Sequence, residues 1–229
     1  MTALPPIYVI SLPGSTRRQK ICSMFDKMDL PFEFWDGVNG SKLDQETLSR
    51  IDTTYTQEQW GHGLGKGEIG CALRHIKLYE HIIKKNINSA IILEDDAKLP
   101  ENFKEVILSL VKKTPKRAEL LYLYHGKAKS WPLKRSLVAG YKLARYRHPS
   151  KNSKRAIIGA VGYWISFNGA KKLADIAYPV RMPADYLTGY IQRSNINAYG
   201  IEPNLITENG LPSEIDTLEK RNYGGHIRN

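Results

Sequence analysis

Cysteine is scarce in this sequence, and long apolar runs are missing from it. Cys22 and Cys71 are too few for a disulfide framework, which favours a reducing compartment, so we expect a cytoplasmic protein. None of the apolar runs approaches the roughly 18 residues of a membrane-spanning helix. The apolar N-terminal segment follows no basic region and is interrupted by Pro5, Pro6 and Pro13, which argues against a signal peptide.

Acidic residues are missing from residues 120–174, although the chain carries 23 of them in all. Aromatic side chains, including Trp131, Tyr141 and Tyr146, interrupt the basic residues of this segment. Such a segment favours a polyanionic partner: a nucleic acid, an anionic membrane or a phosphorylated glycolipid. The alternative is a basic loop that merely faces water. The basic residues are Lys127, Lys129, Lys134, Arg135, Lys142, Arg145, Arg147, Lys151, Lys154 and Arg155.

The hydrophobic pattern predicts an α/β fold, and 229 residues suffice for one large domain or two small ones. Two short apolar segments flank a helical one near the N-terminus, as in a right-handed parallel crossover. Strands are expected over residues 7–12, 32–35, 90–93, 119–124 and 156–166. Helices are expected over residues 17–28, 67–85, 103–113 and 170–176, short helical pieces over 41–60, and a loop from 202 onward.

Three consecutive acids, Glu94, Asp95 and Asp96, directly follow the apolar segment 90–93. In open α/β sheets, ligands bind beyond the carboxyl ends of the strands. Adjacent carboxylates repel one another unless a cation compensates them, and Mg²⁺ and Mn²⁺ prefer oxygen ligands. The triplet therefore indicates a site for a divalent metal that carries substrate phosphates. The alternative is a solvated acidic turn.

Five motifs resemble those of glycosyltransferase family 25, and they follow the family's order. The most specific is Gly67-Glu68-Ile69-Gly70-Cys71-Ala72-Leu73-Arg74-His75, in which Arg74 stands where the family usually has serine. A second departure is Gly14-Ser15, where an Arg-Ser pair is expected. The other motifs are Ile10-Ser11-Leu12 with Arg17-Arg18, Phe34-Trp35-Asp36-Gly37, Leu93-Glu94-Asp95-Asp96 and Gly169-Ala170-Lys171-Lys172-Leu173.

The family contains bacterial lipopolysaccharide and lipooligosaccharide β-galactosyltransferases. The resemblance therefore implies an inverting transferase that uses UDP-galactose with Mn²⁺ or Mg²⁺. It also implies a single GT-A domain over residues 1–229, with a Rossmann-like, mostly parallel sheet and helices on both faces. Residues 1–125 would bind the nucleotide sugar, and residues 126–229 would form the acceptor half and a C-terminal loop region. The implied partners are a lipooligosaccharide or lipopolysaccharide acceptor and the anionic inner leaflet, with no nucleic acid.

A divalent metal at the acid triplet would bridge the two donor phosphates. We expect Asp96 to bind it first and Asp95 next, with Glu94 as an outer contact or a ribose contact. The family resemblance adds His226 as a late ligand from the C-terminal segment and places Ser11, Leu12 and Glu68 in the nucleotide-sugar site.

Basic groups should meet the nucleotide phosphates. Arg17 and Arg18 follow the first strand, and guanidinium groups suit the geometry of phosphate, although both side chains could equally lie on an exposed helix face. Lys66, at the start of a helix, could help to cradle a phosphate. Asp36 could accept hydrogen bonds from ribose or uracil, or stabilise a turn with Gly37.

The acceptor hydroxyl needs a general base. Asp185 is the candidate, because it matches a Pro-Val-Asp position of the family; the alternative is a helix N-cap. His75 is a second candidate, although a histidine at the edge of a helix beside Glu68 is more often structural.

Trp131 and either Tyr163 or Trp164 could stack on sugar rings. Two other functions stay open. A metal-dependent phosphate-ester hydrolase would use the same acids but would need a second carboxylate group, and the sequence offers only Asp185, which argues against this function. A non-enzymatic polyanion-binding protein would use the basic segment and would have no need of the acids.

Overall fold

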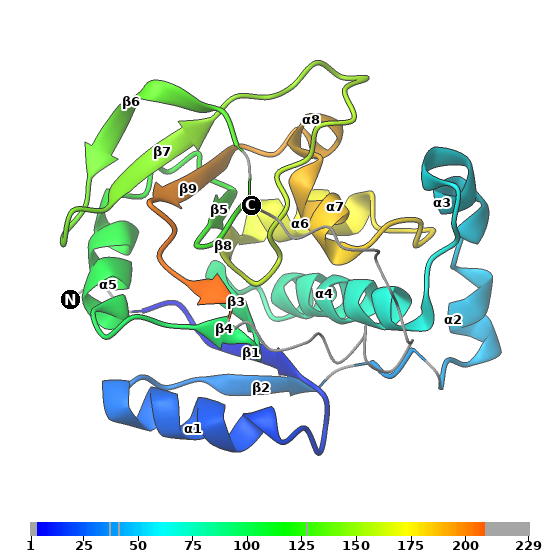
Figure 1. Cartoon of the computed structure of the whole chain (residues 1–229), viewed down its shortest axis with the longest axis horizontal. Coiled ribbons are helices and arrows are strands. Elements are labelled where there is room, and N and C mark those ends of the chain that lie inside the picture. The colour runs from blue at the N-terminus through cyan, green and yellow to red at the C-terminus, as the bar shows by residue number, and fades with distance from the viewer. Residues whose placement is uncertain (1–3, 37, 41, 127, 209–229) are drawn as a thin grey trace.

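An eight-stranded sheet runs through the computed structural model, which describes residues 4–36, 38–40, 42–126 and 128–208 (Figure 1). The strand order is β2-β1-β3-β8-β5-β9-β7-β6. Among these strands, β7 and β8 run opposite to the other six, so the sheet is mixed but mostly parallel in direction. The strands are β1 (Ile7–Ser11), β2 (Glu33–Asp36), β3 (Ser89–Glu94), β5 (Leu120–Tyr122), β6 (Ser130–Ser136), β7 (Lys142–Tyr146), β8 (Gly162–Ser166) and β9 (Ala198–Glu202).

Helices cover both faces of the sheet, which confirms the predicted fold class. Alternate residues of β3 point to opposite faces: Ile92 joins a core with α4, α6, α7 and α8, and Ile91 joins one with α1 and α5. The helices are α1 (Arg17–Met28), α2 (Gln45–Ser49), α3 (Thr53–Trp60), α4 (Lys66–Lys84), α5 (Phe103–Lys113), α6 (Phe167–Asp175), α7 (Ala184–Gly189) and α8 (Ile191–Ser194).

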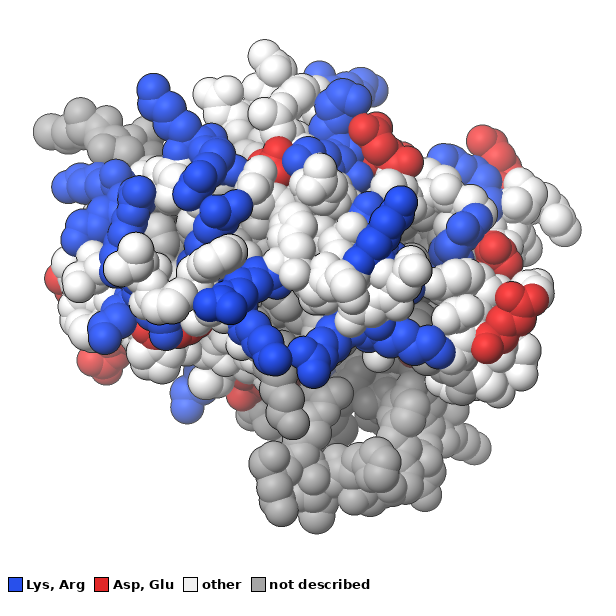
Figure 2. All heavy atoms as spheres, turned by 90° about the horizontal axis from the view of Figure 1, so that it is seen from above, with Lys and Arg blue, Asp and Glu red and all other residues white. Residues whose placement is uncertain are grey.

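The basic segment is divided between a hairpin and a loop. Its first part forms the hairpin of β6 and β7 at the far edge of the sheet from β2, and residues 147–155 lie in the loop that follows β7. Every β6 residue from Trp131 to Ser136 is exposed, so this strand has no apolar alternation from which it could be predicted. Figure 2 shows lysine and arginine side chains gathered on the face above these strands. Lys127 lies outside the described residues.

The strand expected over residues 156–166 is shorter in the structure, where β8 begins at Gly162. Gly159 interrupts the extended chain with a φ of 151°. A Cβ atom there would lie 2.7 Å from the backbone oxygen of Tyr124, so only glycine fits this close approach. The consequence is that residues 156–161 form a loop beside the end of β5.

Two further strands of two residues each were not predicted. β4 (Ala97–Lys98) follows the acids and pairs with β10 (Thr207–Glu208). This pairing brings the segment after β9 back to the acidic turn. Among the described helices, none is both long and apolar enough to cross a membrane.

Candidate active site

The carboxyl ends of β1, β2 and β3 lie side by side and carry polar side chains. In the parallel register, Ser11 of β1 is level with Asp36 of β2, and Ile10 is level with Glu94 of β3. The sheet therefore gathers residues from three distant parts of the sequence at one edge. This is the edge where open α/β sheets bind their ligands.

Asp95 is held by groups from the turn after β1. Its Oδ2 atom accepts a hydrogen bond of 2.7 Å from the Ser11 hydroxyl and a longer one of 3.5 Å from Ser15. Its Oδ1 atom lies 3.0 Å from Nη1 of Arg17. Protein groups thus compensate this carboxylate, and Arg17 is turned toward it.

Asp96 differs from its neighbour because its Oδ1 atom is buried and has no hydrogen-bond partner within the described residues. Burial raises the pKa of this carboxyl, and the charge of Glu94 raises it further. A buried oxygen without a donor is costly unless something cationic meets it. Asp96 therefore fits a hard divalent cation such as Mg²⁺ or Mn²⁺.

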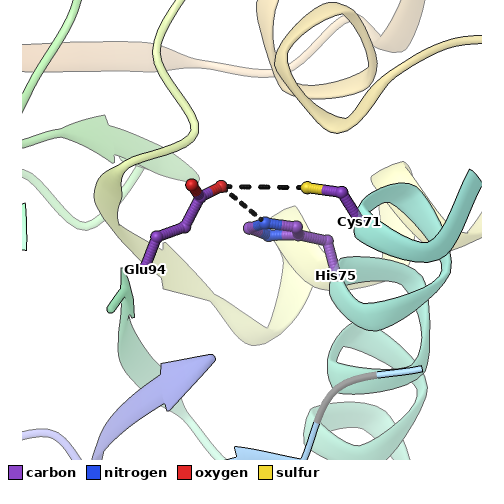
Figure 3. Close-up of side chains that lie close together, drawn as sticks. All are labelled: Cys71, His75 and Glu94. Carbon is purple, nitrogen blue, oxygen red and sulfur yellow. Dashed lines mark hydrogen bonds and ion pairs between the residues drawn. The ribbon is translucent and has the colours of Figure 1, made fainter. Parts of the chain in front are cut away.

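Glu94 faces helix α4 (Figure 3). Its Oε1 atom lies 3.3 Å from Nε2 of His75 and 3.9 Å from Sγ of Cys71. Burial raises the pKa of Glu94, and the charge of Asp95 raises it further. Three carboxyl groups thus share one corner of the fold, and two of them have raised pKa values.

His75 lies in the core rather than beside Glu68 at the edge of the helix. Its ring is fully buried, and Nδ1 lies 2.7 Å from the hydroxyl of Tyr163. Burial lowers the pKa of His75 to about 4. Because the ring has no exposed surface, it cannot contact an acceptor hydroxyl in this conformation. In this arrangement His75 lies between Tyr163 and Glu94, and its assignment as a base stays a prediction.

Asp185 lies in the first turn of α7 and is not the N-cap, which is Pro183. Its Oδ1 atom accepts a hydrogen bond of 2.5 Å from the backbone N–H of Ala160. Burial raises the pKa of Asp185 to about 6, and the charge of Glu94 contributes to the shift. A carboxylate with this pKa can accept a proton near neutral pH.

The other residues expected in the nucleotide-sugar site lie after β1, at the end of β2 and at the start of α4. Arg18 pairs with Asp36 at 2.5 Å and donates to the backbone oxygen of Ser11. Leu12 forms the turn after β1, where its oxygen accepts from Ser15 N. Lys66 is exposed at the start of α4. Glu68 caps the same helix, since its Oε2 atom accepts a 2.9 Å hydrogen bond from the backbone N–H of Gly65.

Two residues near the acids were not found from the sequence. Glu208 of β10 is close enough for its charge to raise the pKa values of Glu94, Asp96 and Asp185. A two-residue strand leaves no signal in the hydrophobic pattern, so Glu208 could not be placed. Cys71 belongs to the most specific motif, and its i, i+4 spacing to His75 was the signal that both side chains lie on one face of the helix. His226 lies outside the described residues.

The aromatic residues expected to stack on sugars lie elsewhere. Tyr163 is fully buried against α4, and Trp164 packs into the core on the opposite face of the sheet. Trp131 is exposed on β6, where the guanidinium of Arg147 lies 4.6 Å from its ring centre. The expectation for Tyr163 is therefore wrong, because its ring is fully buried, whereas Trp164 is half-buried on the other face of the sheet.

Residues 4–188 match the model of glycosyltransferase family 25, which carries the description LPS biosynthesis protein. A proposed glycosyltransferase of Haemophilus influenzae is 40% identical over 101 residues, which are 44% of this chain and 35% of that protein. Procollagen galactosyltransferase 1 of Danio rerio is 24% identical over 229 residues, which are 87% of this chain and 35% of that protein.

An inactive member of the family, from Mus musculus, is 24% identical over 239 residues, which are 93% of this chain and 38% of that protein. The chain thus spans about a third of the length of these relatives. A solved glycosyltransferase that is involved in glycosylation of the major capsid of PBCV-1 is similar with a TM-score of 0.37 and 10% identity. That alignment covers 76% of this chain and 66% of the other, and the likeness in fold is weak.

Proposed function

The chain belongs to glycosyltransferase family 25, and on that premise we propose that it transfers galactose from UDP-galactose to a sugar hydroxyl of a lipooligosaccharide or lipopolysaccharide. The transfer inverts the configuration and is assisted by Mn²⁺ or Mg²⁺. The observation that carries the proposal is the buried Oδ1 atom of Asp96, which has no hydrogen-bond partner among the described residues and lies in a cluster of carboxyl groups at the carboxyl edge of the sheet. Membership of the family supports a nucleotide-sugar donor.

Asp96 would hold the cation in the donor site, with Asp95 as the second candidate ligand. When bound, the cation neutralises the charge of the leaving diphosphate. Arg17 keeps the Asp95 carboxylate in place, and it is close enough to Asp96 and Glu94 for its charge to lower their pKa values. Arg18 holds Asp36 at the end of β2, where this carboxylate can accept from ribose or uracil.

Asp185 would act as the general base. Its raised pKa, about 6, suits a group that takes a proton from an acceptor hydroxyl near neutral pH. The hydrogen bond from Ala160 N fixes one of its oxygens. Inversion requires the base to lie on the face of the sugar opposite the leaving group. Asp185 belongs to α7, whereas the metal ligand Asp96 belongs to the turn after β3.

The acceptor would be bound by residues 126–229, with residues 1–125 binding the donor. The basic hairpin of β6 and β7 would rest on the anionic inner leaflet, where a lipid-linked acceptor is found. Leu133 is 91% exposed and Trp131 is 47% exposed on this hairpin, so apolar side chains accompany the positive charge. Each lysine or arginine near an anionic surface contributes about 1 kcal/mol to binding. We place the protein in the cytoplasm, peripheral to the inner membrane.

The two rival functions fit less well. Glu208 supplies a second carboxylate near the cluster, as a phosphate-ester hydrolase would require, but the family match lies with transferases. The acid cluster and the basic hairpin lie in different parts of the sheet, as a polyanion-binding protein would allow. Such a protein would have no use for the buried carboxyl group of Asp96.

A transfer assay tests the proposal. Purified protein is incubated with Mn²⁺, a truncated lipooligosaccharide and, in separate reactions, UDP-galactose, UDP-glucose or UDP-N-acetylgalactosamine. We expect one hexose to be added from UDP-galactose and none when EDTA is present. Transfer from UDP-glucose or UDP-N-acetylgalactosamine instead would show that galactose is the wrong donor sugar. Release of UDP and free sugar as the sole products would show hydrolysis and contradict the proposed transfer.

A further inference from the structure

Three side chains with different ligand atoms converge between α4 and the end of β3 (Figure 3). Cys71 and His75 are four residues apart on α4 and therefore lie on one face of the helix. Both point toward Oε1 of Glu94. The Sγ, ring nitrogen and carboxylate oxygen atoms all lie within 4.8 Å of one another. A thiol, an imidazole and a carboxylate together make a donor set that differs from the all-oxygen donors expected at Asp96.

The distances in this cluster suit tetrahedral coordination. Zinc–ligand bonds of about 2.0–2.3 Å place neighbouring ligand atoms about 3.3–3.6 Å apart. In the structure, Nε2 of His75 lies 3.3 Å from Oε1 of Glu94, and Sγ of Cys71 lies 3.9 Å from the same oxygen. These two separations are within a few tenths of an ångström of the tetrahedral values, and the third pair, Sγ and the ring nitrogen, lies within 4.8 Å.

His75 is already oriented as a ligand. A histidine that binds a metal through one ring nitrogen usually donates the other N–H to a fixed partner. Here Nδ1 lies 2.7 Å from the hydroxyl of Tyr163, which in turn lies 2.8 Å from the hydroxyl of Tyr79. If Nδ1 carries the proton, Nε2 presents its lone pair to the cluster. Because the ring is fully buried, this orientation is fixed by packing.

The charges around the cluster favour a cation. The charges of Asp96 and Asp185 raise the pKa of Cys71. The charge of Glu208 raises the pKa values of Glu94 and Asp96. Arg74 and Arg17 are the opposing charges, and the Nε atom of Arg74 donates to the backbone oxygen of Val38. The acids outnumber these two arginines, so a divalent ion would reduce the net negative charge.

We propose that Cys71, His75 and Glu94 form a binding site for a soft divalent cation of the zinc class, with three protein ligands and an open fourth position. When the cation binds, the thiol of Cys71 releases its proton to solvent as the sulfur–metal bond forms. His75 and Glu94 each supply a lone pair. Soft thiolate ligands select zinc-like ions over Mg²⁺ and Mn²⁺, which separates this site from Asp96. Under the proposed function, a bound cation would also withdraw Glu94 from the donor site.

Titration with Co²⁺ tests the site without any assay of activity. Cobalt bound to a thiolate gives a charge-transfer band in the near ultraviolet, whereas cobalt bound to oxygen ligands alone does not. We expect the full chain, in the absence of nucleotide, to develop this band up to one equivalent of Co²⁺. Cys71→Ser should lose the band, and the control Cys22→Ser, which changes the other cysteine on α1, should keep it. A wild type without the band, or a band that survives in Cys71→Ser, would overturn the proposal.

A second pair of variants leaves the ligands intact and remains decisive if Cys71→Ser does not fold. Tyr163→Phe removes the hydroxyl partner of His75, and such a change typically lowers metal affinity about 10–100-fold. Tyr122→Phe is the matched control, because this equally buried tyrosine donates to the backbone oxygen of Thr188 instead. Equal Co²⁺ affinities in the two variants would contradict the site. UDP binding, measured separately, tests only the proposed transferase function.

Discussion

Nη1 of Arg17 lies 3.0 Å from Oδ1 of Asp95, and each of these side chains is only 12% exposed. The pair joins the first turn of α1 to the acidic turn after β3. Asp95 is therefore compensated by the protein, whereas Oδ1 of the adjacent Asp96 has no partner within the described residues. This contrast is why we assign the cation to Asp96 first.

Replacing Arg17 should destabilise the fold. In Arg17→Gln the nearly buried Asp95 carboxylate loses its charged partner, and we expect the free energy of unfolding to fall by about 1–3 kcal/mol. Urea unfolding measures the change. Lys20→Gln, at an exposed position of the same helix, is the control and should change stability by less than about 0.5 kcal/mol. Equal effects of the two variants would show that the pair adds no stability.

The dependence of stability on pH should report the raised pKa of Asp185. The pKa rises from 3.8 to about 6 on folding, so the folded state binds the proton more tightly. The stabilising effect of this group is therefore complete below pH 3.8 and is lost as the pH rises through about 6. We expect wild type to lose about 2 kcal/mol relative to Asp185→Asn between these limits.

The measurement is urea unfolding of both proteins in EDTA at several pH values. Asp175→Asn is the control, because this exposed aspartate on α6 lies away from the acid cluster. Wild type and Asp185→Asn curves that run parallel across the pH range would contradict a raised pKa at Asp185.

Asp185 should also govern the rate of transfer. Removal of a general base typically costs about 10²–10⁴-fold in rate, so Asp185→Asn should lower kcat by that factor while leaving UDP affinity nearly unchanged. In wild type, kcat/KM should rise with pH through about 6, since only the ionised carboxylate accepts a proton. A variant that keeps the wild-type kcat would remove Asp185 from the mechanism.

The basic hairpin should bind anionic membranes. Wild type should sediment with vesicles that contain phosphatidylglycerol at low salt. At high salt it should stay in the supernatant, because salt screens the attraction between the basic hairpin and the anionic lipid. The double variant Lys129→Glu with Lys142→Glu should bind more weakly, and so should Leu133→Ser. Lys20→Glu with Lys77→Glu makes the same charge change at exposed positions on α1 and α4 and serves as the control. Equal loss in both double variants would indicate that net charge, and not the hairpin, governs binding.

Local patterns predicted the elements that hold the site. The apolar run before Glu94 predicted the buried strand β3, and the helix predicted over residues 67–85 is α4 (Lys66–Lys84). The motif resemblance to family 25 is confirmed by the match over residues 4–188. In these segments the local pattern and the tertiary fold agree.

Contacts between distant residues could not be predicted. His75 and Tyr163 are 88 positions apart, and periodicity does not show which neighbour a helix residue meets. The pairing of β10 with β4 depends on two residues in each strand, so Glu208 had no local signal. The β6–β7 hairpin was hidden because an exposed edge strand lacks apolar alternation.

Calorimetric titration of UDP tests the central claim most directly. It is performed on wild type and Asp96→Asn, each with Mn²⁺ and with EDTA, and Asp175→Asn serves as the control. We expect UDP to bind wild type and the control in Mn²⁺, EDTA to abolish this binding, and Asp96→Asn to lose it. UDP binding that is equal in wild type and Asp96→Asn, or absent from wild type under both conditions, would contradict a nucleotide-sugar site at the acid cluster.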